Sequence, residues 1–391
     1  MTELVASRGH VDPRAQAPLD ARGSSPEAPL IDVRSVTKRY EGFTLDAVDL
    51  RVEPGQVVGF IGQNGAGKST TIKALLGLIG LDGGEARVLG VPAGAFAGPA
   101  AADVREQVGV VFDTVSVPPH LRVAEVGALM ASAYTTWDAG AFAQLLGRFE
   151  LDGTKLVKEL SRGMGMKLSL ACALAHRPRV LILDEATAGL DPMARDEVLD
   201  LLRDFVAVED GAGNLRNGIL MSSHITSDLE KIADEIVCID AGRIVFRCTK
   251  DEITDLMGVA RCRMADLERL AREGGDVLVP AQEGLPGTRA SAGAVGVAAR
   301  EARASGAPHA EAATAGRPGA ASAHGARGIR YVRHDYGADV LVPDRFAFAE
   351  MFPEIPCDRM SIDDYMTLML KGALLAAGPA ASKGGERPCC A

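Results

Sequence analysis

The stretch Gly62-Gln63-Asn64-Gly65-Ala66-Gly67-Lys68-Ser69-Thr70 stands between an apolar run, Val57 to Ile61, and a helical pattern that begins at Thr70. Its glycines let the backbone turn tightly, so that successive N–H groups point inward at phosphate oxygens. The positive N-terminal end of the following helix favours the same anion. Lys68 is placed to supply charge to the β- and γ-phosphates, and the Ser69 hydroxyl is placed for Mg²⁺. The sequence therefore predicts a loop that holds a nucleoside triphosphate.

Composition limits what else the chain can be. It has 391 residues, of which 47% are hydrophobic, which is enough for two or three domains. The net charge of −10 and the pI of about 5.3 argue against a nucleic-acid partner. Mean hydropathy is only +0.09, and no run approaches the roughly 20 apolar residues of a membrane-spanning helix. The N-terminus lacks the pattern of a secretory signal, so we expect a cytoplasmic protein.

Two further apolar strands end in chemically useful residues. Val180 to Leu183 runs directly into Asp184 and Glu185. In nucleotide-binding α/β folds such a strand end lies beside the phosphate loop, so Asp184 would hold the metal and Glu185 would act as general base for the attacking water. The strand Ile219–Ser223 delivers His224, which can reach the γ-phosphate as a hydrogen-bond donor.

Patterns around these strands predict the rest of a mixed α/β domain, which we place at residues 29–250. Apolar and polar residues alternate from Leu30 to Gly55, which indicates antiparallel strands. Tyr40 lies at a turn between two of them, where its ring could stack on a nucleotide base. Between about 115 and 165 the period becomes helical, which predicts a helical insertion.

The two ends of the chain have a different composition. Residues 1–28 lack periodicity and are expected to form a disordered tail. Residues 373–391 are expected to form a tail after the last helix. Residues 251–372 read as a small α+β appendage with a flexible Ala/Gly-rich insertion at about 283–327. Within it, Val340–Val342 reads as a strand, and Ser361 opens a helix with a capping box.

A family resemblance becomes visible at Leu160-Ser161-Arg162-Gly163-Met164. This stretch resembles the signature of ATP-binding cassette (ABC) ATPases, and the order of elements is that of the family: phosphate loop, signature, Asp184-Glu185, Gly189-Leu190-Asp191 and then His224. Tyr134–Asp138, Met166–Leu170 and Ser223–Glu230 further resemble bacterial exporter cassettes of the antimicrobial-peptide and phenol-soluble-modulin type.

The resemblance implies two cassettes that sandwich two ATP molecules with Mg²⁺. Each cassette, in a homodimer or a heterodimer, would complete its partner's site, and both would dock on a separate membrane permease at the inner face of the membrane. Carried over by position, the ATP-binding set is Tyr40, Gly62, Asn64, Gly65, Ala66, Gly67, Lys68, Ser69, Thr70, Ser161, Gly163 and Asp191. The catalytic set is Glu185, His224 and Lys68, and the metal set is Ser69, Asp184 and Asp113.

Ser161 itself supports a role in a second chain. It precedes a helical pattern from about Met164 to Ala175, so its hydroxyl and the following N–H groups form an anion site with no use within one monomer.

Three positions depart from the family pattern. Asp113 stands where most cassettes have a glutamine that contacts Mg²⁺ and the permease. Arg162 and Met164 replace a glycine and a glutamine of the signature, and Ala186 replaces the proline that usually follows the acidic pair. The first two affect details of coupling, and none removes the catalytic base.

The expected function is therefore ATP hydrolysis coupled to transport, with export of a peptide, drug or lipid-like substrate preferred. One alternative is a soluble ABC-type translation factor, which would normally need two cassettes and a basic linker in one chain. The other is a switch that binds ATP without turnover, against which the presence of Glu185 argues.

Overall fold

A six-stranded sheet forms the centre of the molecule. The computed structural model describes residues 28–273, 278 and 328–376. The sheet order is β10-β9-β3-β8-β7-β6, and all neighbours are parallel except β9 and β10, which form an antiparallel hairpin. Its strands are β3 (Val57–Ile61), β6 (Val108–Val111), β7 (Val180–Asp184), β8 (Gly218–Ser222), β9 (Glu235–Asp240) and β10 (Arg243–Thr249).

Strands β3, β7 and β8 are buried at every position, as expected for parallel strands that are covered on both faces. Because parallel strands end at the same edge of a sheet, the phosphate loop after β3, Glu185 after β7 and His224 after β8 emerge side by side.

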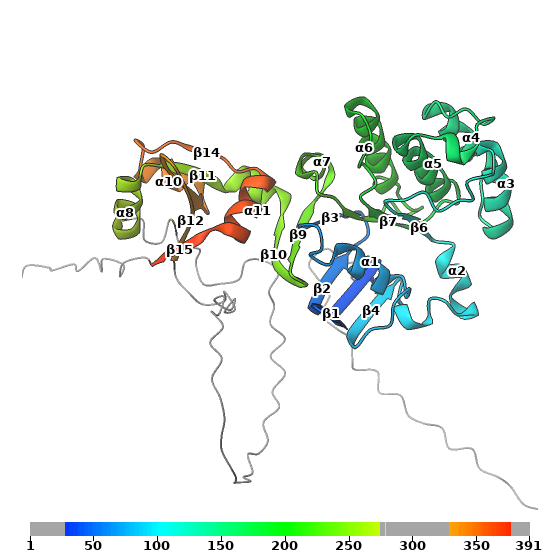
Figure 1. Cartoon of the computed structure of the whole chain (residues 1–391), viewed down its shortest axis with the longest axis horizontal. Helices are drawn as coiled ribbons and strands as arrows, with labels where there is room; N and C mark the ends of the chain where they lie inside the picture. Colours follow the sequence, from blue (N-terminus) through cyan, green and yellow to red (C-terminus); the bar gives the residue numbers. More distant parts are fainter. Residues whose placement is uncertain (1–27, 274–277, 279–327, 377–391) are drawn as a thin grey trace, which may run out of the picture.

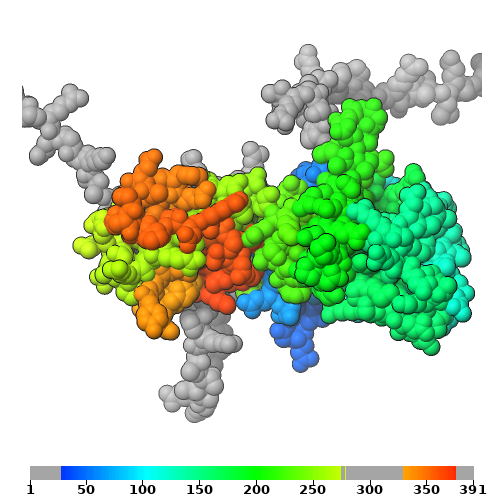
Figure 2. Space-filling model, turned by 90° about the horizontal axis from the view of Figure 1, so that it is seen from above, coloured from blue at the N-terminus to red at the C-terminus, as the bar shows by residue number. Residues whose placement is uncertain are grey.

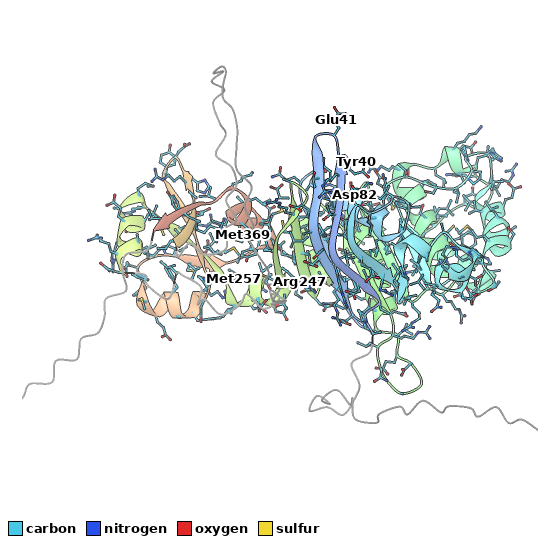
Figure 3. The ribbon with its side chains drawn as sticks, turned by 90° about the horizontal axis from the view of Figure 1, so that it is seen from below. Tyr40, Glu41, Asp82, Arg247, Met257 and Met369 are labelled. Carbon is cyan, nitrogen blue, oxygen red and sulfur yellow. The ribbon has the colours of Figure 1, made fainter. Side chains whose placement is uncertain are left out.

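A four-stranded antiparallel sheet, with order β2-β1-β4-β5, shares a hydrophobic core with one face of the central sheet and with α1. Its strands are β1 (Ile31–Tyr40), β2 (Phe43–Val52), β4 (Gly83–Val88) and β5 (Val91–Pro92). This sheet confirms the antiparallel pattern predicted from Leu30 to Gly55. In Figure 3 Tyr40 and Glu41 lie at the tip of the β1–β2 hairpin, with Asp82 close by. The Asp82 carboxylate accepts a 2.7 Å hydrogen bond from the Arg39 N–H.

Helices complete this N-terminal part, residues 28–250, with α3, α4 and α5 gathered at one end of the molecule (Figure 1). Two helices, α3 and α4, lie in the predicted helical insertion. Leu129 of α3 remains 41% exposed, whereas Val126 is buried. The bounds are α1 (Lys68–Leu75), η1 (Ala93–Ala95), η2 (Pro99–Ala101), α2 (Ala102–Arg105), α3 (Val123–Ala133), α4 (Ala139–Arg148), η3 (Val157–Glu159), α5 (Arg162–Ala175), α6 (Pro192–Val206) and α7 (Thr226–Ile232).

The described C-terminal part, from residue 251 to 376, builds an antiparallel sheet of its own in the order β14-β11-β13-β12-β15. Its strands are β11 (Gly258–Cys262), β12 (Gly328–His334), β13 (Gly337–Val342), β14 (Cys357–Arg359) and β15 (Ala373–Ala376). Around them lie the short π-helical turn η4 (Glu252–Leu256) and the helices α8 (Met264–Glu273), α10 (Arg345–Met351) and α11 (Ile362–Lys371).

The structure corrects one boundary in this part. Residues Ala373–Ala376, expected to begin the C-terminal tail, form β15 and pair with Gly328–Tyr331 of β12. Pairing with a strand far away in sequence satisfies the backbone of Ala-Leu-Leu-Ala, which carries no strand signal of its own. The strand at Val340–Val342 and the capping box at Ser361 are confirmed. The predicted N-terminal tail up to residue 27, the insertion at 283–327 and the end of the chain from 377 lie outside the described residues.

The C-terminal part packs against the N-terminal part through α11. Tyr365 of α11 is buried, and its ring meets the Phe246 ring of β10 edge-on at 4.7 Å between centroids. Figure 2 shows the red segment that contains α11 against the green surface of the N-terminal part. Among the described helices, none has the length and apolar character needed to cross a membrane.

Candidate nucleotide site

The phosphate loop, residues 62–70, joins the end of β3 to the start of α1. Gly67 precedes the helix at φ 121°, and an added Cβ at Gly62 would lie 2.3 Å from the Ile239 carbonyl oxygen, so both positions require glycine. Lys68 is buried, and its Nζ donates a 2.7 Å hydrogen bond to the Gly62 carbonyl oxygen. The ammonium group is therefore held at the mouth of the loop.

The turn between β9 and β10 fixes the other side of this loop. Gly242 donates its N–H to the Ala66 carbonyl oxygen at 2.8 Å, and its own carbonyl accepts a 2.8 Å bond from the Asp46 N–H. One residue thus links the phosphate loop to β2, because its two backbone groups face opposite neighbours.

Ser222, at the end of β8, organises the acidic pair at the end of β7. Its hydroxyl donates to Asp184 Oδ1 at 2.5 Å, and Asp184 is only 4% exposed. The Glu185 N–H donates to the Ser222 carbonyl oxygen at 3.1 Å. Glu185 has a left-handed backbone, φ 57°, which is unusual for a residue with a side chain. This conformation is held by the hydrogen bonds from the adjacent strand.

The structure brings together three residues predicted to act on the γ-phosphate. One carboxylate oxygen of Glu185 lies 3.7 Å from Lys68 Nζ. The other contacts His224 Nδ1 and lies 3.4 Å from the His224 N–H. The carboxylate therefore stands between an ammonium and an imidazole at one edge of the sheet.

These groups line a cavity of about 700 Å³. Asp113 also lines it, whereas Asp184 and Ala66 are buried and are not among its lining residues. Several lining residues were not among the predicted site residues, including Phe43, Arg162, Thr226 and Met366. The described lining consists of Phe43, Ile61, Gly62, Gln63, Asn64, Gly65, Gly67, Lys68, Ser69, Thr70, Asp113, Arg162, Glu185, Ala188, Ser223, His224, Thr226 and Met366.

Tyr40, the predicted base-stacking residue, is 46% exposed and does not line this cavity. Its cross-strand partner in the β1–β2 hairpin is Phe43, which does. Lys38 Nζ lies 5.7 Å from the centre of the Tyr40 ring. The hairpin therefore offers two aromatic rings near the phosphate loop, one inside the cavity and one at the exposed tip.

Ser161, Gly163 and Asp191 do not line the cavity of their own chain. Ser161 caps α5 by accepting a 3.2 Å hydrogen bond from the Met164 N–H. Asp191 caps α6 in the same way, and the Ala194 N–H that it accepts holds the pKa of this carboxyl below its usual value. Both side chains therefore cap a helix of their own chain, and neither lines its own nucleotide cavity.

A strand, a glycine-rich loop and a helix on a parallel sheet, with an acidic pair at the end of a nearby strand, define a P-loop nucleoside triphosphatase. Comparison with known proteins gives the family. The ABC transporter family profile matches residues 45–188. The chain is 35% identical over 238 residues to the daunorubicin resistance ATP-binding protein DrrA3 of Streptomyces coeruleorubidus. The aligned segment covers 57% of this chain and 69% of that protein.

A second relative is the Nod factor export ATP-binding protein I of Burkholderia pseudomallei, 35% identical over 54% of this chain and 68% of that protein. A solved structure of an ATP-binding subunit of an ABC transporter is 30% identical, covers 57% of this chain and 91% of that one, and superposes with a TM-score of 0.51. The chain belongs to the ABC transporter family and is an ATP-binding cassette ATPase. The prediction from the signature and its neighbouring motifs is confirmed at this level, and the likeness to peptide exporters stays a prediction.

Proposed function

We propose that this cassette hydrolyses ATP to drive export through a separate membrane permease against which it docks at the cytoplasmic face. Support comes from the relatives, whose names describe drug resistance and Nod factor export. A drug, a peptide or a lipid-like molecule is the expected cargo. The main support for hydrolysis is the position of the Glu185 carboxylate, which lines the cavity beside Lys68 and His224.

In this proposal Glu185 accepts the proton of the attacking water, because its carboxylate faces the cavity and contacts groups that stabilise its charge. Lys68 contributes its ammonium to the β- and γ-phosphates. His224, at the end of β8, donates a hydrogen bond to the γ-phosphate. Tyr40 at the tip of the β1–β2 hairpin stacks on the adenine.

Mg²⁺ fits the oxygen donors at the loop. The Ser69 hydroxyl lines the cavity, and Asp184 is held by Ser222 with one carboxylate oxygen not engaged in that bond. Proteins usually bind this ion through one or two such groups together with the substrate phosphates, rather than through a cage of side chains. When bound, Mg²⁺ neutralises phosphate charge. Asp113 lines the same cavity and is proposed to reach the metal through water and to sense the permease.

A second cassette is proposed because three predicted ATP-binding residues do not line the cavity of their own chain. Ser161 and Gly163 stand at the start of α5, outside the chain's own cavity. We infer that they contact the γ-phosphate held by a second cassette, with Asp191 in the crossing loop. A homodimer or a heterodimer satisfies this geometry equally.

The test is Glu185→Gln, with Glu209→Gln as control, because Glu209 is exposed and does not line the cavity. We expect Glu185→Gln to retain ATP binding and to lose about 100-fold or more of steady-state hydrolysis. The ATP-bound variant should elute as a dimer on a sizing column. Wild-type turnover in this variant would remove Glu185 from the proposed role.

Transport is tested separately by co-purification with a polytopic membrane protein from a neighbouring reading frame. Stimulation of the ATPase by that partner supports the transport role. Full ATPase activity with no membrane partner would favour a soluble ATPase instead.

A further inference from the structure

The C-terminal part contributes one residue to the wall of the nucleotide cavity. Met366 of α11 lines this cavity together with Ser223, His224 and Thr226, and every other described lining residue precedes position 227. The family profile ends at residue 188, so α11 lies outside the segment that it matches. A helix from outside the matched segment therefore reaches the site of ATP hydrolysis.

Two contacts fix α11 in this position. Its first N–H, on Ile362, donates a 2.8 Å hydrogen bond to Glu230 Oε1 of α7. Tyr365, which is 2% exposed, packs edge-on against Phe246 of β10, and its hydroxyl lies 3.5 Å from Cys248 Sγ. Successive residues of a helix point about 100° apart, so a Tyr365 side chain fixed in the core also fixes the direction of Met366.

The helix that receives α11 is the one that follows His224. Helix α7 begins at Thr226, and the short connection from β8 is held by a 2.9 Å bond from the Ile225 N–H to the Ser223 hydroxyl. The α11 contact with Glu230 therefore acts on the short helix that directly follows the His224 connection. The His224 side chain is 57% exposed, and it contacts the Glu185 side chain.

We propose that Met366 is a positioning residue for ATP hydrolysis, through which the C-terminal part sets the orientation of the His224 loop. This inference rests on the proposed hydrolysis of ATP at the cavity. Met366 supplies no proton and no charge. Its thioether side chain adds an apolar surface to the cavity wall that His224 also lines, and in this proposal that surface restricts the loop.

The chain offers a matched control for this proposal. Met369 lies one helical turn further along α11, is half-buried like Met366 and packs against the same core, but does not line the cavity. Figure 3 labels it in the C-terminal part of the molecule. Met366→Ala and Met369→Ala thus remove the same atoms from the same helix at similar burial.

The experiment measures ATPase kinetics and melting temperature for the full chain. For Met366→Ala we expect kcat to fall by about 3- to 30-fold, because misplacement of a phosphate-contacting group slows the chemical step, with KM for ATP changed less than about twofold. Met366→Leu should restore most of kcat, since it conserves side-chain volume. Met369→Ala should keep the wild-type kcat.

Three outcomes would overturn the inference. One is a wild-type kcat in Met366→Ala. Another is an equal loss of kcat in Met366→Ala and Met369→Ala that follows their melting temperatures, which would make both residues packing groups only. The third is a rise in KM without a fall in kcat. If Met366→Ala does not fold, Met366→Gln takes its place, because it keeps the length of the side chain at a half-exposed position. A wild-type protein that does not hydrolyse ATP would instead contradict the proposed function.

Discussion

Replacing Gly242 with alanine should weaken ATP binding from a position that does not line the nucleotide cavity. Gly242 has a φ of 80°, in the region that favours glycine. An alanine Cβ there would lie 1.9 Å from the Thr44 carbonyl oxygen. Since the obstacle is backbone, the turn must move away from β2, and the bonds to Ala66 and Asp46 must lengthen or break.

The cost has two contributions. A left-handed backbone costs an alanine about 1–2 kcal/mol. Loss of the two backbone hydrogen bonds adds about 1 kcal/mol each. We therefore expect Gly242→Ala to lower the free energy of unfolding by about 3–4 kcal/mol in total.

Gly90→Ala is the matched control. Its φ is 79°, but no atom lies within 4 Å of the added Cβ, so only the backbone term of about 1–2 kcal/mol remains. Urea titration measures both stabilities, and a fluorescent ATP analogue measures affinity. Of the two variants, only Gly242→Ala should weaken binding of the nucleotide, because Gly242 is the one that bonds to Ala66 of the phosphate loop. Equal stability losses in the two variants, or unchanged affinity in Gly242→Ala, would refute this reasoning.

Three further predictions follow from other parts of the structure. Burial lowers the pKa of His176 below its ordinary 6.5, so the unfolded chain binds a proton at this residue more readily than the folded chain does. The neutral, buried His176 therefore contributes its full stability above pH 6.5. That contribution is lost as the pH falls through the pKa of the folded state. His176→Phe should therefore lose less stability than wild type between about pH 7.5 and pH 5.5 in urea titrations, and equal losses would contradict the assignment. Tyr40→Ala should weaken ATP binding by about 1–3 kcal/mol, while Tyr40→Phe should bind ATP as the wild type does. Unchanged affinity in Tyr40→Ala together with a loss in Phe43→Ala would transfer base stacking to Phe43. Buried Asp228 lies 3.7 Å from Arg195, so Asp228→Asn should cost about 1–3 kcal/mol, and a double-mutant cycle with Arg195→Gln in urea should show coupling rather than additive losses.

The phosphate loop and the acidic pair could be predicted from sequence because their chemistry is local. A strand, a fixed glycine spacing and a helix specify the loop within about 20 residues. Asp184, Glu185 and His224 follow apolar strands, and the rule that parallel strands end at one edge brings them to the phosphate loop without knowledge of the strand order. The observed order β3-β8-β7 agrees with that rule.

Long-range contacts could not be predicted in this way. Glycine is a common turn residue, but the close approach of Gly242 to Thr44 depends on how β2 packs on the hairpin. Strand β15 depends on pairing with β12, which a single sequence does not encode as a pattern. Met366 lines the cavity because Tyr365 packs on β10, whereas the sequence predicted only a helix that begins after Ser361.

Ser222 and α7 hold different residues of the site, which explains why a movement of α11 should affect turnover more than ATP binding. The Ser222 side chain holds Asp184, and its backbone holds Glu185, from within a strand buried at every position. His224 lies beyond the end of that strand, on the connection to α7, where α11 attaches through Glu230. A displacement of α11 therefore reaches the γ-phosphate end of the site through α7, while the Asp184 carboxylate and the Glu185 backbone remain fixed by the central sheet. The C-terminal part is placed to change the rate of hydrolysis at nearly constant affinity for ATP.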